Sequence, residues 1–113
     1  MDIEQVIHLT SAKVVAGIKD RKIVENGFCS DLMSDVLTID TDKMLLITGM
    51  ANVQAIRTAE MADVQCVLLV RNKKASPEMI KLAVENGMLL MQTSISMFKA
   101  AGILYNAGLK PVY

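Results

Sequence analysis

The sequence has 113 residues, of which 52% are hydrophobic and 21% charged, and its formal net charge is zero. This length is typical of one domain, and the apolar content is enough for a core and argues against intrinsic disorder. The neutral balance and the 4% aromatic content argue against binding to nucleic acid or to an anionic membrane surface.

Cysteine usage and the N-terminal residues indicate where the protein works. Asp2 and Glu4 stand where a secretory signal would be basic, and no apolar run approaches the length of a membrane span. Cys29 and Cys66 lie far apart without a CxxC motif. We therefore expect a cytoplasmic protein with reduced thiols, no metal site, no cofactor and no membrane contact. The nine methionines favour core filling together with a subunit interface.

The first quarter of the chain predicts short elements, because its apolar residues come in brief groups between polar and glycine residues. In order, we expect a helix at 2–9, a strand at 13–16, a charged turn at 19–22, and an extended piece from Ile23 that ends in a turn at Asn26–Gly27.

Small polar residues are unusually dense between Phe28 and Asp35. The local interpretation is that Ser30 or Asp31 caps a short helical turn, while Ser34 or Asp35 bonds to nearby backbone. The alternative is that these four polar residues form a ligand-binding cluster.

A regular pattern begins at residue 44, where apolar runs alternate with helical spacing. The expected elements are a strand at Met44–Thr48, a helix from Asn52 to Ala62, a strand at Gln65–Arg71, a helix opened by Ser76 and Pro77 and ended at Asn86–Gly87, a strand at Met88–Met91, and a last helix up to Gly108. Nearly continuous apolar strands are typical of parallel sheets covered on both faces. The sequence therefore predicts an α/β fold, a single two-layer or three-layer domain with a mainly parallel sheet built from β-α repeats.

Hydroxyl, amide and glycine residues follow the predicted strands, and the carboxyl ends of parallel strands meet at one rim, where open α/β sheets usually bind ligands. We name Thr48, Gly49, Asn52, Thr93 and Ser94 as candidate residues for a nucleotide or another phosphorylated ligand. The simpler interpretation is that Asn52, Thr93 and Ser94 are ordinary helix caps. The basic run Arg71–Lys74 is typical of a solvated loop.

Motifs for catalysis are missing. The sequence contains neither GxxxxGK[ST] nor a GxGxxG after a strand, and His8, the only histidine, has no Ser or Cys partner nearby in sequence. We therefore predict no catalytic residue and no enzyme activity; an enzyme with Asp31 or Asp35 as base is the third hypothesis.

Three segments, Gly27–Leu37, Leu46–Gly49 and Leu104–Gly108, together resemble the DRTGG-domain family over nearly the whole chain. The family includes the N-terminal domain of HPr kinase/phosphorylase and domains between the CBS domains of certain pyrophosphatases. Small stand-alone members are often encoded beside iron-hydrogenase and electron-transfer components. The Asp-Arg pair that names the family is absent after the central strand, where this chain reads Thr48-Gly-Met-Ala-Asn52.

The resemblance implies a single domain over residues 1–113, with a fold like that of the HPr kinase N-terminal domain. It also implies a non-catalytic regulatory or protein-interaction module that forms a homodimer, through either the Phe28–Leu37 segment or an exposed helix face. A protein partner in hydrogenase or electron-transfer systems follows from the same resemblance. The alternative function is a small-ligand sensor for a nucleotide or phosphometabolite at the rim of the sheet.

Overall fold

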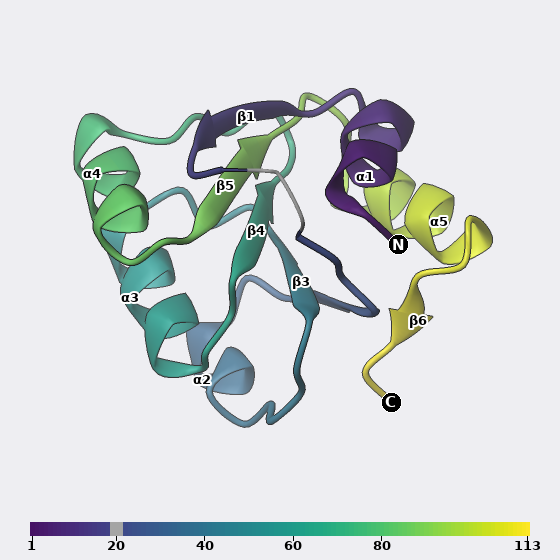
Figure 1. The fold of residues 1–113 in the computed structure, drawn as a ribbon, viewed down its shortest axis with the longest axis horizontal. Helices are drawn as coiled ribbons and strands as arrows, with labels where there is room; N and C mark the ends of the chain where they lie inside the picture. Colours follow the sequence, from purple (N-terminus) through teal and green to yellow (C-terminus); the bar gives the residue numbers. More distant parts are fainter. Residues whose placement is uncertain (19–21) are drawn as a thin grey trace.

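The computed structural model describes residues 1–18 and 22–113 (Figure 1). Most of the charged turn predicted at 19–22 therefore lies outside the described residues. The helices are α1 (Ile3–Thr10), α2 (Met33–Val36), α3 (Val53–Met61), α4 (Pro77–Glu85) and α5 (Met97–Asn106). The strands are β1 (Lys13–Ala16), β2 (Asn26–Cys29), β3 (Met44–Thr48), β4 (Cys66–Leu69), β5 (Leu89–Gln92) and β6 (Lys110–Pro111).

The strands form one six-stranded sheet in the order β1-β5-β4-β3-β2-β6. β2 to β6 are paired in parallel with their neighbours, and only β1 runs antiparallel, against β5. Parallel neighbours need a crossover connection between them. Helix α3 connects β3 to β4, and α4 connects β4 to β5. The predicted α/β fold with a mainly parallel sheet is therefore confirmed.

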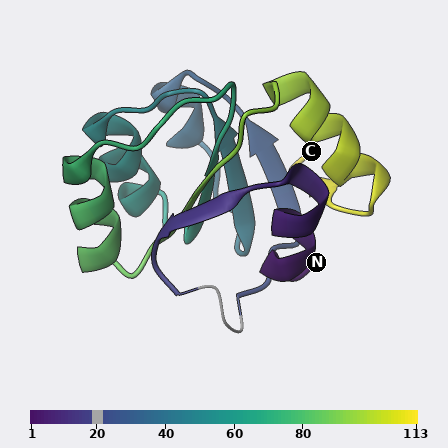
Figure 2. The ribbon, with the colours of Figure 1, turned by 90° about the horizontal axis from the view of Figure 1, so that it is seen from above.

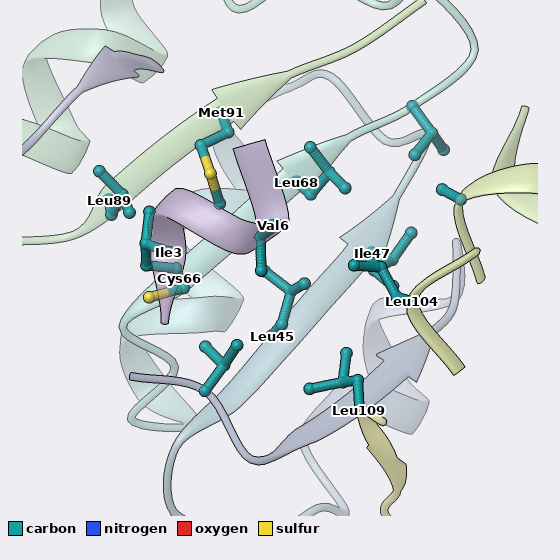
Figure 3. Packing of buried hydrophobic residues seen from close by; sticks show 13 residues of the cluster. Ile3, Val6, Leu45, Ile47, Cys66, Leu68, Leu89, Met91, Leu104 and Leu109 are labelled. Carbon is teal, nitrogen blue, oxygen red and sulfur yellow. The ribbon is translucent and has the colours of Figure 1, made fainter. Parts of the chain in front are cut away.

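Helices cover both faces of this sheet, so the domain has three layers. Figure 2 shows α3 and α4 on one side of the strands and α1 and α5 on the other. All five residues of β3 are buried, and Leu45 and Ile47 belong to the core under α1 and α5, whereas Met44 and Leu46 belong to the core under the other helices. In Figure 3, Ile3 and Val6 of α1 pack over the first of these cores. Because both faces of the strand are buried, its sequence is apolar at every position but the last.

The helix starts follow local sequence rules. Ser76 and Asn52 cap α4 and α3, as their positions in the sequence predict. Asp2 caps α1 and forms a capping box with Gln5. The last helix differs from the prediction, because Ser96, and neither Thr93 nor Ser94, accepts the capping hydrogen bond, from the backbone of Lys99.

Two predictions around β2 are wrong. Asn26 and Gly27 form the first residues of β2 and no turn, since Gly27 lies in parallel register with Leu45 and Pro111. Pairing on both sides thus outweighs the turn preference of this dipeptide. A short helix does follow, but its N-cap residue is Leu32, whose side chain makes no capping hydrogen bond, so neither Ser30 nor Asp31 caps it.

Candidate functional site

The carboxylate of Asp31 lies at the carboxyl ends of three neighbouring strands and gathers their polar groups. Its Oδ1 accepts hydrogen bonds from the backbone N–H of Gly49, at 2.7 Å, and from the hydroxyl of Thr48, at 3.1 Å. Its Oδ2 accepts a hydrogen bond from Nη1 of Arg71 at 2.9 Å. We call these four residues the rim cluster.

The topology explains why residues so far apart in the sequence meet. β2, β3 and β4 are parallel neighbours, so the residues that follow each strand emerge at the same edge of the sheet. Asp31 follows β2, Gly49 follows β3, and Arg71 comes shortly after β4, although Asp31 and Arg71 are 40 positions apart. The rim cluster is a product of sheet order.

The backbone after β4 is held in a tight turn. Arg71 and Asn72 have φ angles of 60° and 59°, in the left-handed region of backbone conformation, which residues other than glycine rarely adopt. The Arg71 N–H donates to the carbonyl of Ile95 at 2.8 Å, and the Asn72 N–H donates to the carbonyl of Thr93 at 3.1 Å. These bonds to the loop after β5 offset the conformational cost and fix the point from which the guanidinium reaches Asp31.

Opposing effects act on the charge of Asp31. Partial burial works to raise the pKa of this carboxyl, but hydrogen bonds from Gly49, Arg71 and Thr48 and the guanidinium charge outweigh it. The pKa of Asp31 is therefore below its ordinary value, and the group is a carboxylate at neutral pH. A carboxylate with a lowered pKa is a poor proton acceptor, which argues against Asp31 as a general base.

Gly49 has a steric role beside this ion pair. A Cβ built on Gly49 would overlap the guanidinium of Arg71, and even the more distant Nη1 would be only 2.9 Å away. A side chain at position 49 would thus push the guanidinium away from Asp31. The structure thus gives Gly49 a close contact with Arg71, and its role in binding a ligand stays a prediction.

The other candidate rim residues serve different purposes. The side chain of Asn52 accepts a hydrogen bond from the backbone of Ala55 and caps α3. The hydroxyl of Thr93 donates to the carbonyl of Thr10 at 2.6 Å and so ties the loop after β5 to the end of α1. Ser94 is exposed to solvent. Of the five candidates, Thr48 and Gly49 are the ones whose polar groups meet in the rim cluster.

The second predicted cluster also divides. Ser30 bonds within its own loop, donating to the carbonyl of Leu32 at 3.2 Å and accepting from the N–H of that residue at 3.0 Å. Ser34 and Asp35 lie exposed on α2. The backbone N–H of Ser30 donates to the carbonyl of Ile47 on β3 at 3.1 Å, but among the side chains of these four residues it is the one of Asp31 that bonds to groups following the neighbouring strands.

Sequence reasoning missed the role of Arg71, because a basic run on a loop is usually solvated. Its side chain is 44% exposed, yet it is paired with Asp31. The useful signal was a long cationic side chain two positions after a buried strand, together with an acidic residue, Asp31, two positions after another strand.

Features that would mark other classes of protein are missing from the described part of the chain. Residues 1–18 and 22–113 contain no group of His, Cys, Asp and Glu side chains arranged to hold a metal ion. Within the same residues, none of the helices has the length and apolar character needed to cross a bilayer.

Comparisons with known proteins place the fold. No protein-family model matches this sequence, and a search of curated proteins also finds no match. Among solved structures, the chain superposes on part of a chain that contains the CBS and DRTGG domains of the regulatory region of Clostridium perfringens pyrophosphatase, in complex with the activator diadenosine tetraphosphate. The TM-score is 0.80 at 16% sequence identity.

This match covers 98% of the present chain and 48% of the other, so the chain spans about half the length of that regulatory region. At this level of identity the likeness concerns the fold. The fold fits a DRTGG-like domain, as the resemblance drawn from the sequence predicted.

Proposed function

We propose that residues 1–113 form a single non-catalytic regulatory module of DRTGG type that acts as a homodimer. The observation that carries the proposal is the structural match, because nearly the whole chain superposes on part of a regulatory region. The rim cluster supports it, since its carboxylate is engaged by three donors and has a lowered pKa. Structural pairing of this kind suits a scaffold better than proton transfer.

Exposed apolar side chains support self-association. In the segment from Phe28 to Leu37, Leu32 is 58% exposed and Leu37 is 51% exposed, at opposite ends of the short helix α2. Apolar groups in such positions gain free energy when a partner covers them. A net charge of zero also gives little repulsion between two copies. We assign the dimer contact to this segment.

Light scattering on the purified protein at micromolar concentration tests the assignment. We expect a dimer for the natural sequence and a monomer for the double variant Leu32→Ser with Leu37→Ser. Met61→Ser is the matched control, because Met61 is also exposed, at 64%, but lies on α3. A monomeric natural protein would refute the homodimer, and a double variant that stays dimeric would move the interface elsewhere.

A second candidate function is a sensor for nucleotides or phosphorylated metabolites at the rim, because the three donors around Asp31 are arranged to hold an oxyanion. A phosphate group would have to displace the carboxylate of Asp31 to use them. The regulatory region of similar fold is complexed with diadenosine tetraphosphate, which makes this compound a reasonable first probe.

A thermal-shift experiment with diadenosine tetraphosphate, ATP and inorganic phosphate tests the sensor. Binding to the folded state raises the midpoint as ligand concentration increases. We expect Asp31→Asn to strengthen the response, because it removes the competing charge, and Arg71→Gln to abolish it. A flat response from all three proteins would rule out the rim as a site for these ligands.

A cytoplasmic location is part of the proposal, since both thiols would stay reduced there. In the described residues Cys29 and Cys66 are free, one exposed and the other buried.

A protein partner in hydrogenase or electron-transfer systems is also part of the proposal. Copurification of this protein with the products of neighbouring genes tests it.

A further inference from the structure

A cavity of about 340 Å³ opens between α5 and the sheet edge formed by β2 and β6. Small-molecule sites begin at roughly 300 Å³, so this volume suits a compact ligand. Its floor includes Ile47, Leu104 and Leu109, which also close the core under α5. Figure 3 shows Ile47 and Leu104 side by side at this end of the core. The cavity is separate from the rim cluster, none of whose residues lines it.

The outer face of α5 carries aromatic side chains that the core of the domain does not bury. Ala100 and Leu104 of this helix are buried in the core that covers this face of the sheet, and Met97 packs against the same core. A second stripe, with Phe98, Gly102 and Tyr105 at helical spacing, lines the cavity. Phe98 is 90% exposed and Tyr105 is 68% exposed. Two aromatic rings on the open side of a cavity indicate a surface that something else covers.

Gly102 is a second, independent indication that the outer face of α5 is covered by another molecule. Glycine is a poor helix former, and a Cβ built at position 102 would meet nothing within 4 Å. Packing within the described chain therefore gives no reason for glycine here. Its effect is to leave the cavity wall open between the turns that carry Phe98 and Tyr105.

The charge of the cavity is one-sided. Among the residues that the structure describes, Lys110 is the one charged residue that lines it. Within residues 1–18 and 22–113, the ammonium of Lys110 makes no hydrogen bond or ion pair, although its backbone N–H is bonded to Glu25. An unpaired cation at the end of an apolar groove favours an anionic group on the ligand.

We propose that this groove binds a small amphiphilic anion. Its flat aromatic or short acyl body would lie on the face of α5 against Phe98 and Tyr105, and its carboxylate, sulfonate or phosphate would approach Nζ of Lys110. The proposal depends neither on the homodimer nor on the rim cluster, because it uses different residues.

The test uses 1-anilinonaphthalene-8-sulfonate, an aromatic anion whose fluorescence rises on binding, with the full folded chain. We expect saturable binding to one site per chain. Gly102→Leu should weaken it on the order of tenfold by filling the groove. Asn106→Leu is the matched control on the same helix, exposed and outside the cavity lining, and should bind as the natural protein does. Circular dichroism checks that both variants are folded.

The anionic part of the proposal has its own comparison. Lys110→Gln should weaken binding of the sulfonate about three- to fivefold, since the ion pair forms at a solvent-exposed site. Binding of the uncharged analogue N-phenyl-1-naphthylamine should not change. An equal effect on both probes, or on neither, would overturn the role of Lys110.

Cys29 reports the location of the probe, because it lines the cavity and is exposed, whereas Cys66 is buried. Bound probe should slow the alkylation of Cys29 in proportion to occupancy. Unprotected Cys29 at saturation would place the probe elsewhere and refute the site. Light scattering of Gly102→Leu tests whether a second copy of the chain occupies the groove. If the natural protein is a dimer and this variant is a monomer, the groove is an interface between copies and the ligand proposal fails.

Discussion

Asp31 shows how the meaning of one residue depends on its neighbours in space. From the sequence it is a small acidic residue beside a short helix. In the structure it is the acceptor for a backbone N–H, a hydroxyl and a guanidinium. Its side chain is 36% exposed, so solvent screens the ion pair and its energetic contribution is modest.

Replacing this residue by Asn should lower the free energy of unfolding by about 1 kcal/mol at pH 7, the usual size for a partly exposed, charge-assisted pair. Because the pKa of Asp31 is lowered in the folded state, its stabilising effect is complete above the unfolded pKa and is lost as the pH falls through the folded one. The difference in the free energy of unfolding between the natural protein and Asp31→Asn should therefore have its full size above about pH 5 and become smaller below about pH 4. Urea unfolding at several pH values measures it.

Asp35→Asn is the control for this experiment, since Asp35 is an exposed acidic residue on the adjacent helix. We expect it to change stability little at any of these pH values. A constant difference for Asp31→Asn between pH 7 and pH 3 would contradict the assigned role of the carboxylate.

The two thiols should differ in reactivity with a disulfide reagent in the folded protein. Burial raises the pKa of Cys66 to about 11, despite the nearby charge of Lys22, and the residue is only 2% exposed. Desolvation also raises the pKa of Cys29, but this residue is exposed. We expect one thiol per chain to react under native conditions and a second after unfolding in urea. Two thiols reacting at once in the folded protein would contradict the packing of β4.

The start of one helix in this protein follows from adjacent residues, whereas the start of another depends on packing. The pattern Ser76-Pro77-Glu78 marks the start of α4 correctly, because every group involved is adjacent in sequence. The start of α5 is harder to predict, since Thr93, Ser94 and Ser96 are all chemically suitable. The hydroxyl of Thr93 is used elsewhere, by Thr10, and that choice is made by packing against α1.

Alanine substitutions distinguish the candidates for the α5 cap. Ser96→Ala should cost about 1 kcal/mol of stability, because the backbone N–H of Lys99 loses its acceptor. Ser94→Ala should cost little, as an exposed change outside the cap. Equal costs at both positions, measured by thermal or urea unfolding, would mean that the helix starts earlier than Ser96.

At the scale of the whole molecule, the central strand is the feature that organises the fold. Neighbouring residues of β3 enter different cores, one under α1 and α5 and the other under α2, α3 and α4 (Figure 2). An antiparallel sheet with one wet face would bury alternate residues only. The three-layer architecture therefore requires that every residue of β3 be buried, which substitutions on the two faces of the strand can test.

Leu45→Ala and Leu46→Ala should each lower the free energy of unfolding by about 2–5 kcal/mol, since both side chains are fully buried on opposite faces. Denaturant unfolding measures both. A loss below about 1 kcal/mol at either position would show that one face of the sheet is not covered as described.

The sequence by itself determined the class of fold and most of its elements. Apolar runs such as Met44–Thr48 must be buried on both faces, and the caps Asn52 and Ser76 act over a few residues, so both signals are local. Tertiary structure decided what depends on distant partners. β2 begins at Asn26–Gly27 only because β3 and β6 lie beside it, and β6 is too short to have a signal of its own.

The rim cluster and the groove beside α5 belong to the second group. Arg71 meets Asp31 because strand order brings the ends of β2, β3 and β4 to one edge, and no local preference encodes that order. Lys110 and Phe98 face one cavity because the chain returns along the sheet edge after α5. Neighbouring residues set which elements form, whereas the packing of those elements sets which side chains meet.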